Sequence, residues 1–273
     1  MQKSKNWYEI IRQKDYLYVI RERLDQIEPR FLTKYLNLYL LVGNNNALLI
    51  DTGCGLFPLK PLIDEIVKDK TLLVINTHSH FDHIGANDEF KEVMIHENER
   101  KKIIKTTDVS FLKYSVKEVV NNYKVKDFKL KPANSVKTLK NSDNLDLGGI
   151  SLKIIHTPGH SKGSVCLISN TRELFTGDTA HYGSMYLPKQ RKFPLFLESI
   201  QKLIQIYDNK KIEEIYPSHE QFAVKKDLLV NLYNGMKNIE KIWKIKIKDK
   251  FLGSWILQDE FFRYIVEKNF RKS

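Results

Sequence analysis

The stretch Thr77-His78-Ser79-His80-Phe81-Asp82-His83 is the part of the sequence that says most about the fold. It directly follows the apolar run 72–76, which predicts a buried strand. Three histidines and an aspartate are therefore expected on the loop at the carboxyl end of that strand. Imidazole and carboxylate are common ligands of zinc and related divalent metals. The pattern favours a metal-binding loop over a polar turn with surface histidines.

Three further candidate ligands have the same placement, on loops that directly follow predicted strands. They are His160, Asp178 and His219. Loops at strand ends can converge at one edge of a folded sheet, where rigid scaffolds place their chemistry. Together with the four candidates of the first loop they make seven. Seven ligands are too many for one tetrahedral zinc, but they suit two metals bridged by a carboxylate and a hydroxide.

Hydrophobic periodicity predicts a chain of alternating strands and helices. Strands are predicted at 16–21, 35–42, 47–50, 72–76, 93–96, 151–156, 165–169, 173–175 and 212–216. Helices are predicted at 61–68, 84–90, 194–207 and 227–243. Segments 255–257 and 261–266 are predicted as closing strands or as a terminal helix. The interleaved order indicates an α/β protein.

The composition is that of a soluble globular protein, with 42% apolar and 11% aromatic residues in 273. No linker or repeat is evident, so residues 1–273 are predicted to form a single domain, with a helical insert at about 97–140. The apolar runs are too short to span a bilayer and the N-terminus is polar, so we expect a cytoplasmic protein without a membrane span. Cys54 and Cys166 lack the CxxC spacing and fit a reducing compartment.

The formal charge of +12 bears on the choice of partner. Most of the 45 cationic residues are lysines, and they are scattered along the chain. Scattered lysines usually form a solvated surface, which argues against nucleic acid as the partner. An anionic small-molecule substrate is compatible with this charge, and the oligomeric state is left open.

Five ordered loops resemble the motifs of the metallo-β-lactamase-fold hydrolases, and in particular the glyoxalase II-like, thioesterase and lactonase branch. They are Asp51-Thr52-Gly53, His78–His83, Pro158-Gly159-His160, Gly177-Asp178 and Pro217-Ser218-His219. The resemblance implies a four-layer αβ/βα sandwich, in which two mixed β-sheets face each other and helices cover both outer sides. The motifs span residues 51–219, and the flanking elements extend the match over most of the chain.

The resemblance also implies a role for each candidate ligand. A first metal would be bound by His78, His80 and His160, and a second by Asp82, His83 and His219, with Asp178 bridging the two. Asp82 would also act in catalysis by orienting the hydroxide. Asp51 would anchor the histidine loop without binding metal. Zn²⁺ is the expected ion at both positions, and Fe or Mn would suit the same ligands.

The expected function is hydrolysis of a thioester, ester or lactone by a hydroxide that bridges two metal ions. No clear general acid is found for the leaving group, which favours thiolates and alkoxides over amines. Two alternatives are a metal-dependent nuclease acting on RNA or DNA and a β-lactamase acting on β-lactam amides. Only 41 residues separate Asp178 from His219, which leaves no room for the domain that one nuclease group inserts there.

Residues that contact the substrate are predicted only from their position. Tyr182, Met185 and Tyr186 closely follow Asp178 and are expected near the substrate, although packing of this loop would explain them equally well. In the 97–140 segment, aromatic side chains that could contact substrate or pack the insert are Phe111, Tyr114 and Tyr123.

Overall fold

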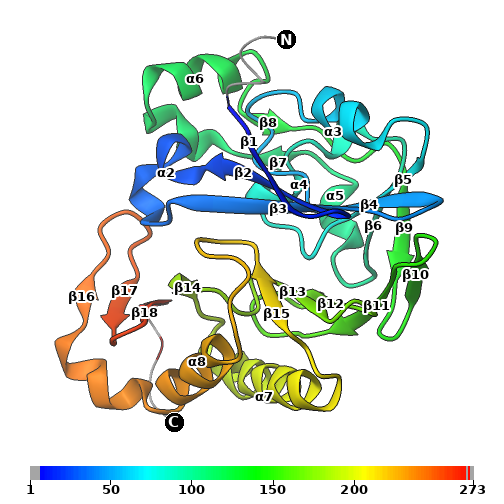
Figure 1. Ribbon diagram of the computed structural model, residues 1–273. Coiled ribbons are helices and arrows are strands. Elements are labelled where there is room, and N and C mark those ends of the chain that lie inside the picture. The colour runs from blue at the N-terminus through cyan, green and yellow to red at the C-terminus, as the bar shows by residue number, and fades with distance from the viewer. Residues whose placement is uncertain (1–6, 269, 271–273) are drawn as a thin grey trace.

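The first of two facing β-sheets has seven strands in the computed structural model, which describes residues 7–268 and 270 (Figure 1). The strands are, in sheet order, β1 (Glu9–Lys14), β2 (Leu17–Arg23), β3 (Tyr35–Val42), β4 (Asn46–Ile50), β5 (Thr71–Ile75), β6 (Val93–His96) and β9 (Val136–Leu139). Strands β1 to β4 alternate in direction, and β4, β5, β6 and β9 run parallel to one another. Consequently, the loops that follow β4 and β5 leave the sheet at the same edge, and these loops carry Asp51 and His78–His83.

The second sheet has five strands, in the order β10 (Asn144–Asp146), β11 (Ser151–His156), β12 (Val165–Ser169), β13 (Glu173–Gly177) and β15 (Glu214–Pro217). Because β12 is antiparallel to both of its neighbours and β13 is parallel to β15, strands β11, β13 and β15 all point the same way. Their carboxyl ends lead into the loops that carry His160, Asp178 and His219.

Helices cover the outer face of each sheet. In Figure 1, α3 (Lys60–Val67) lies above the seven-stranded sheet, and α7 (Phe193–Asn209) and α8 (Asp227–Lys237) lie below the five-stranded sheet. Leu62, Ile63 and Val67 of α3 are buried against the first sheet, as the helical spacing requires. The prediction of two mixed sheets flanked by helices is confirmed.

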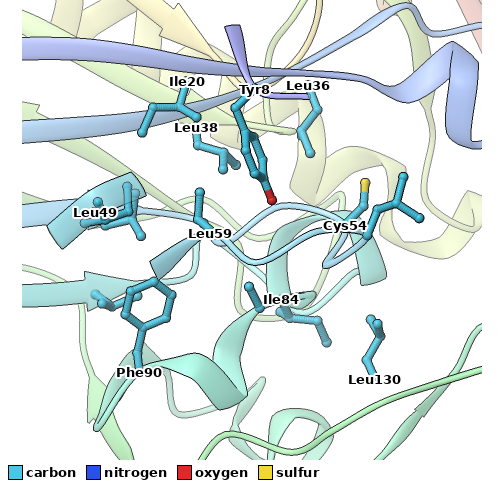
Figure 2. Close-up of a cluster of buried hydrophobic side chains, with 14 of the residues drawn as sticks. Tyr8, Ile20, Leu36, Leu38, Leu49, Cys54, Leu59, Ile84, Phe90 and Leu130 are labelled. Atoms are coloured by element: carbon cyan, nitrogen blue, oxygen red, sulfur yellow. The ribbon is translucent and has the colours of Figure 1, made fainter. Parts of the chain in front are cut away.

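The side chains of strand β3 contribute to two clusters of buried hydrophobic residues, one on each face of the first sheet. Leu36, Leu38 and Leu40 point to the helix side and pack in the cluster shown in Figure 2, with Tyr8, Cys54 and other residues. The intervening Tyr39 and Leu41 point to the second sheet. This alternation follows from the two-residue period of a strand, and it buries β3 on both faces.

A third sheet of four strands is formed largely by the C-terminal part of the chain. Its order is β14 (Gly183–Tyr186), β18 (Phe262–Val266), β17 (Trp255–Gln258) and β16 (Ile247–Lys248), and it lies beside α8 in Figure 1. Of the two predictions for this region, the closing strands are therefore confirmed and the terminal helix is wrong. Strand β14 immediately follows the loop of Asp178, so this sheet lies next to the candidate ligands.

Two predicted helices are shorter than expected. The segment predicted at 84–90 is instead α4 (Phe81–Ile84) followed by the 3₁₀ turn η2 (Asn87–Glu89). Helix α8 ends at Lys237 and is followed by the 3₁₀ segment η5 (Ile239–Ile245) rather than continuing to residue 243. Within the described ranges 7–268 and 270, no helix is long and apolar enough to cross a bilayer.

Residues 97–140 contain short elements, together with one strand of the main sheet. These are α5 (Arg100–Ile103), β7 (Thr107–Asp108), η3 (Ser110–Tyr114), α6 (Lys117–Lys124), β8 (Lys129–Leu130) and the sheet strand β9. Tyr123 is fully buried and donates a hydrogen bond to the carbonyl oxygen of Cys54, so it packs the segment down. Tyr114 is 81% exposed, whereas Phe111 lies at the pocket described below. The remaining short elements are α2 (Leu24–Ile27), η1 (Pro29–Phe31) and η4 (Gln190–Lys192).

Candidate metal centre

The seven candidate ligands converge between the two sheets, at the edge where the strands end. Their donor atoms form two groups, one of His78, His80, His160 and Asp178 and the other of Asp82, His83 and His219. Within each group the donor atoms all lie within 4.8 Å of one another. The loops were expected to converge because each follows a predicted strand, and their donor atoms do lie together.

Three imidazole nitrogens of the first group form a tight triangle. His78 Nε2 and His80 Nδ1 are 2.9 Å apart, and His160 Nε2 lies 3.2 Å from the first and 2.9 Å from the second. Asp178 Oδ2 lies 3.4 Å from His160 Nε2. The ligands of a tetrahedral zinc, at its usual zinc–nitrogen distance, are roughly 3.3 Å apart. The spacing of these four donors therefore fits a single metal ion.

The second group faces the other oxygen of the same carboxylate. Asp178 Oδ1 lies 3.2 Å from His83 Nε2 and 3.1 Å from His219 Nε2. Asp82 Oδ2 completes the group at 3.6 Å from His83 Nε2 and 3.5 Å from His219 Nε2. Asp178 thus presents one oxygen to each group, which is the geometry that a bridging carboxylate needs.

Two atoms of the centre are buried without a hydrogen-bond partner among the described residues. They are His83 Nε2 and Asp178 Oδ1. A buried polar atom without a partner costs about 1–3 kcal/mol, so native structures rarely tolerate one without a reason. Both atoms point into the second donor group, where a cation would satisfy them. This observation, together with the donor spacing, indicates that the residues present fit two metal ions.

Asp51 fixes the loop that carries three of the histidines. Its Oδ1 accepts a hydrogen bond from the Thr77 amide at 2.7 Å, and its Oδ2 accepts from the Thr77 hydroxyl at 2.8 Å. His83 Nδ1 also donates to Oδ2, at 2.8 Å. Because its Nδ1 carries the proton, His83 is left with a free lone pair on Nε2, the nitrogen that faces the metal position.

Three further imidazoles, those of His78, His160 and His219, are held in the same tautomer by oxygen acceptors. His160 Nδ1 donates to the Tyr186 carbonyl at 3.3 Å, and His219 Nδ1 donates to the Tyr35 carbonyl at 3.2 Å. The Thr77 hydroxyl already donates to Asp51, so at 3.2 Å it accepts from His78 Nδ1. In each of these rings Nε2 is therefore the free donor atom.

Two contacts tie the ligand loops to each other and to the sheets. Glu99 accepts hydrogen bonds from the hydroxyl of Ser79 and, at 2.8 Å, from the amide of Gly163, so it joins the two loops of the first group. Asn37 of β3 donates through its side chain to the Pro217 carbonyl at 3.1 Å. The second contact fixes the loop of His219 against the opposite sheet.

The electrostatics of the centre favour neutral imidazoles in the first group and an ionised bridge. Burial lowers the pKa of His160 to about 3 and holds the pKa of His78 well below its usual value. Burial alone would raise the pKa of Asp178, but the nearby imidazoles of His219 and His83 outweigh it and hold that pKa well below normal. A neutral imidazole and a carboxylate are the forms that bind metal.

A cavity of about 520 Å³ opens beside the donor atoms. Candidate ligands contribute one side of its lining, namely His80, Asp82, His160, Asp178 and His219. The rest of the lining, called the apolar wall below, consists of Leu24, Phe31, Phe81, Phe111, Tyr186, Phe251 and Leu252, together with Thr33 and Ser184. The volume lies within the range of small-molecule sites, and an apolar wall next to a few polar groups is their usual composition.

Of the three residues expected near the substrate, the structure brings only Tyr186 to this cavity. On β14, Ser184 and Tyr186 face the cavity, whereas Met185 between them points the other way into the core under α7 and α8. Tyr182 stacks on Phe262 with ring centroids 5.6 Å apart, and it lines a separate hollow. The expectations for Tyr182 and Met185 are corrected for this reason, since both pack away from the donor atoms.

The wall also contains residues that the sequence did not suggest. Phe31 and Phe251 lie far apart in the chain and belong to no recognisable motif, yet their ring centroids are 5.6 Å apart. Neither has a local pattern that could have identified it, because the pocket is formed by long-range packing. Phe81 did have such a signal, since it lies between ligands in the histidine loop.

Two other histidines lie nearby but outside both donor groups. The His181 ring is buried 4.9 Å from that of His219, and its Nδ1 donates to the Tyr182 carbonyl. His156 stacks on His96 with centroids 4.1 Å apart and planes inclined by 11°. The motif pattern selects neither His156 nor His181 as a ligand, and the donor groups of the structure contain neither.

Comparison with known proteins gives several relatives. Acyl-coenzyme A thioesterase MBLAC2 from Bos taurus is 29% identical over 232 residues, which cover 78% of this chain and 81% of that protein. The probable metallo-hydrolase MJ0888 from Methanocaldococcus jannaschii is 34% identical over 194 residues, covering 68% and 88% of the two chains.

Solved structures agree in fold. The metallo-beta-lactamase family protein TTHA1429 from Thermus thermophilus is 18% identical, with a TM-score of 0.60 over 85% of this chain and 83% of that chain. DIM-1 metallo-beta-lactamase is 17% identical, with a TM-score of 0.60 over 85% and 98%. At these identities the likeness shows the fold alone. The family model of the metallo-beta-lactamase superfamily matches residues 35–219, and the chain therefore belongs to the metallo-beta-lactamase superfamily.

Proposed function

We propose that this protein is a metal-dependent thioesterase that hydrolyses thioesters of apolar acyl groups. The observation that carries the proposal is the cavity itself, in which an apolar wall faces a set of seven converging metal-ligand candidates. An acyl chain packed on the wall would place its carbonyl carbon next to the donor groups. The similarity to a protein named an acyl-coenzyme A thioesterase supports the same substrate class.

The donor set supports two divalent ions, for which we propose Zn²⁺ because the ligands are imidazole and carboxylate at tetrahedral spacing. Bound there, such ions would supply hydroxide at neutral pH and stabilise the charge that develops on the carbonyl oxygen. In this proposal, His78, His80 and His160 hold one ion, Asp82, His83 and His219 hold the other, and Asp178 contacts both.

Residues of the chain contribute orientation and proton handling. Asp82 lines the cavity while its Oδ2 faces His83 and His219, so it can accept a hydrogen bond from the attacking water and direct it at the carbonyl carbon. The wall opposite excludes water from the acyl chain. Asp51 keeps His83 in the tautomer that the second donor group needs.

The lining of the cavity favours thioesters over amides. Apart from the candidate ligands, the described residues that line it offer hydroxyls at Thr33, Ser184 and Tyr186, but no carboxylic acid and no further imidazole. An amine leaving group needs a proton from a general acid. A thiol, with an ordinary pKa of about 8.5, leaves readily as the thiolate.

We also propose that the protein acts in the reducing cytoplasm. Cys54 and Cys166 are buried and form no disulfide, which supports this location.

A substrate panel tests the proposal. Zinc-loaded protein is assayed on dodecanoyl-coenzyme A, a lactone, a β-lactam and RNA, before and after exhaustive chelation. We expect the thioester to be hydrolysed with the highest kcat/KM, and we expect chelation to abolish this activity and zinc to restore it. Preferred cleavage of the lactone, the β-lactam or RNA would overturn the thioesterase assignment. Activity that survives complete chelation would overturn the metal mechanism.

A further inference from the structure

We propose that Arg30 is a positioning residue that gives the cavity its selectivity for long acyl chains. Arg30 does not line the cavity and touches none of the candidate ligands; it lies behind the apolar wall and joins three of the chain segments that form it. The inference rests on the proposed thioesterase function and adds to it a residue that decides which acyl groups are accepted.

The first connection anchors Arg30 to its own segment. The guanidinium forms a two-pronged contact with the carboxylate of Glu28, with Nε donating to Oε1 at 2.6 Å and Nη2 donating to Oε2. The Glu28 side chain is 1% exposed, and its Oε1 also accepts from the Arg30 amide at the start of η1. Planar, two-pronged pairs of this kind fix the orientation of both groups.

The second and third connections reach two distant segments. Arg30 Nη2 donates to the carbonyl oxygen of Phe111 in η3, at 3.1 Å. The guanidinium carbon lies 3.9 Å from the ring centroid of Phe251, in the loop between β16 and β17. A guanidinium that stacks on a ring and donates within its own plane can make both contacts at once, whereas an ammonium cannot reproduce this geometry.

Phe31, the residue next to Arg30, is the centre of the wall that these contacts hold in place. Its ring centroid lies 5.8 Å from that of Phe81, 5.9 Å from Phe111, 5.6 Å from Phe251 and 6.3 Å from Tyr186. The Tyr186 hydroxyl also donates to the Phe31 carbonyl, at 3.1 Å. Arg30 therefore links the segments of Phe111 and Phe251, whose rings both contact Phe31.

This arrangement predicts an effect that depends on the length of the acyl chain. Without the guanidinium, the 111 and 251 segments lose their shared attachment and the wall loosens. A long acyl chain gains its binding free energy from close apolar contact, so it loses affinity when the wall moves. A short acyl group reaches mainly the donor groups, which Arg30 does not touch, so its hydrolysis is expected to change little.

The test compares the double variant Arg30→Met/Glu28→Gln with the wild-type protein. Glutamine at position 28 avoids leaving a buried carboxylate without a partner. Its side-chain oxygen can still accept the hydrogen bond from the backbone amide of residue 30. We expect KM for dodecanoyl-coenzyme A to rise about tenfold with kcat little changed, and kcat/KM for acetyl-coenzyme A to stay within about twofold. Arg30→Lys should behave like the double variant.

The matched control is Arg23→Met. Arg23 forms the same two-pronged contact with Asp25, at 2.8 and 2.7 Å, and its side chain is 38% exposed, against 34% for Arg30. It lines no part of the cavity, so its removal should leave both kinetic constants unchanged. An equal loss on both substrates in the Arg30 variants, or no loss on either, would overturn the proposal.

A binding measurement separates this inference from the proposed function. Dodecanoate is titrated into the zinc-loaded wild type and the double variant by calorimetry, which requires no turnover. We expect about tenfold weaker binding to the variant even if the physiological substrate is not a thioester. Equal affinity would contradict the role of Arg30, whereas absence of thioester hydrolysis by the wild type would contradict only the proposed function.

Discussion

The metal centre and the apolar wall face each other across one cavity but are assembled in different ways. The candidate ligands lie on loops at the carboxyl ends of sheet strands, and all of them fall within residues 35–219, which match the superfamily. The wall draws on short helices and turns, on β14 and on a hairpin loop. Phe31 and Phe251 lie outside that match, whereas Phe81, Phe111 and Tyr186 lie within it. The superfamily core thus holds every candidate ligand, whereas segments on either side of it are needed to complete the wall.

The largest effect is expected from a substitution of Asp178, the carboxylate that faces both donor groups. Asp178→Asn keeps the size of the side chain but removes the charge that faces both donor groups. We expect loss of bound metal and at least about a thousandfold loss of kcat/KM, because the metals provide several kcal/mol of transition-state stabilisation. A variant that kept both metals and full activity would contradict the assignment of Asp178.

A smaller effect is expected from the residue that supports the histidine loop. Asp51 has a φ of 65°, a left-handed conformation that asparagine also tolerates, so Asp51→Asn leaves the backbone undisturbed. The amide NH₂ cannot accept, so one of the three hydrogen bonds from Thr77 and His83 is lost if it replaces Oδ1, and two are lost if it replaces Oδ2. We expect metal affinity to fall about 10–100-fold, measured by competition with a chromophoric chelator. Unchanged affinity would show that the loop is held by other contacts.

The smallest effect is expected in the wall. Phe31→Ala removes the ring on which four aromatic side chains pack, and it leaves every candidate ligand in place. We expect about two equivalents of metal as in the wild type, and KM for dodecanoyl-coenzyme A raised about fivefold to tenfold, since part of a ring contributes roughly 1–1.4 kcal/mol. Loss of metal in this variant would show that the two regions are coupled, against our comparison.

The two regions also differ in how far the sequence could predict them. The seven candidate ligands each follow an apolar strand in a short motif, so local sequence was sufficient to identify them, and the structure brings their donor atoms together. The positions of most strands follow from the same local pattern, whereas their arrangement in two mixed sheets was implied by the resemblance to the family. Local rules govern the ligands and the strand positions, because strand periodicity and loop position are properties of neighbouring residues.

The wall could not be predicted in this way. Its members come from positions 24–33, 81, 111, 186 and 251–252, which packing alone brings together. Closeness to Asp178 in sequence was not enough to identify residues of the cavity. Side chains alternate along β14, so Met185 points into the core and Tyr186 into the cavity. The short strand β16 and the loop after it had no signal beyond alternating lysine and isoleucine, and they supply Phe251.

Zinc titration of chelator-stripped protein, with dodecanoyl-coenzyme A as substrate, shows whether thioester hydrolysis depends on two metal ions. We predict that hydrolysis is absent in the stripped protein and rises with added zinc to a plateau at about two equivalents per chain. Hydrolysis that persists without metal, or a plateau at one equivalent that Asp82→Ala leaves unchanged, would contradict a two-metal thioesterase.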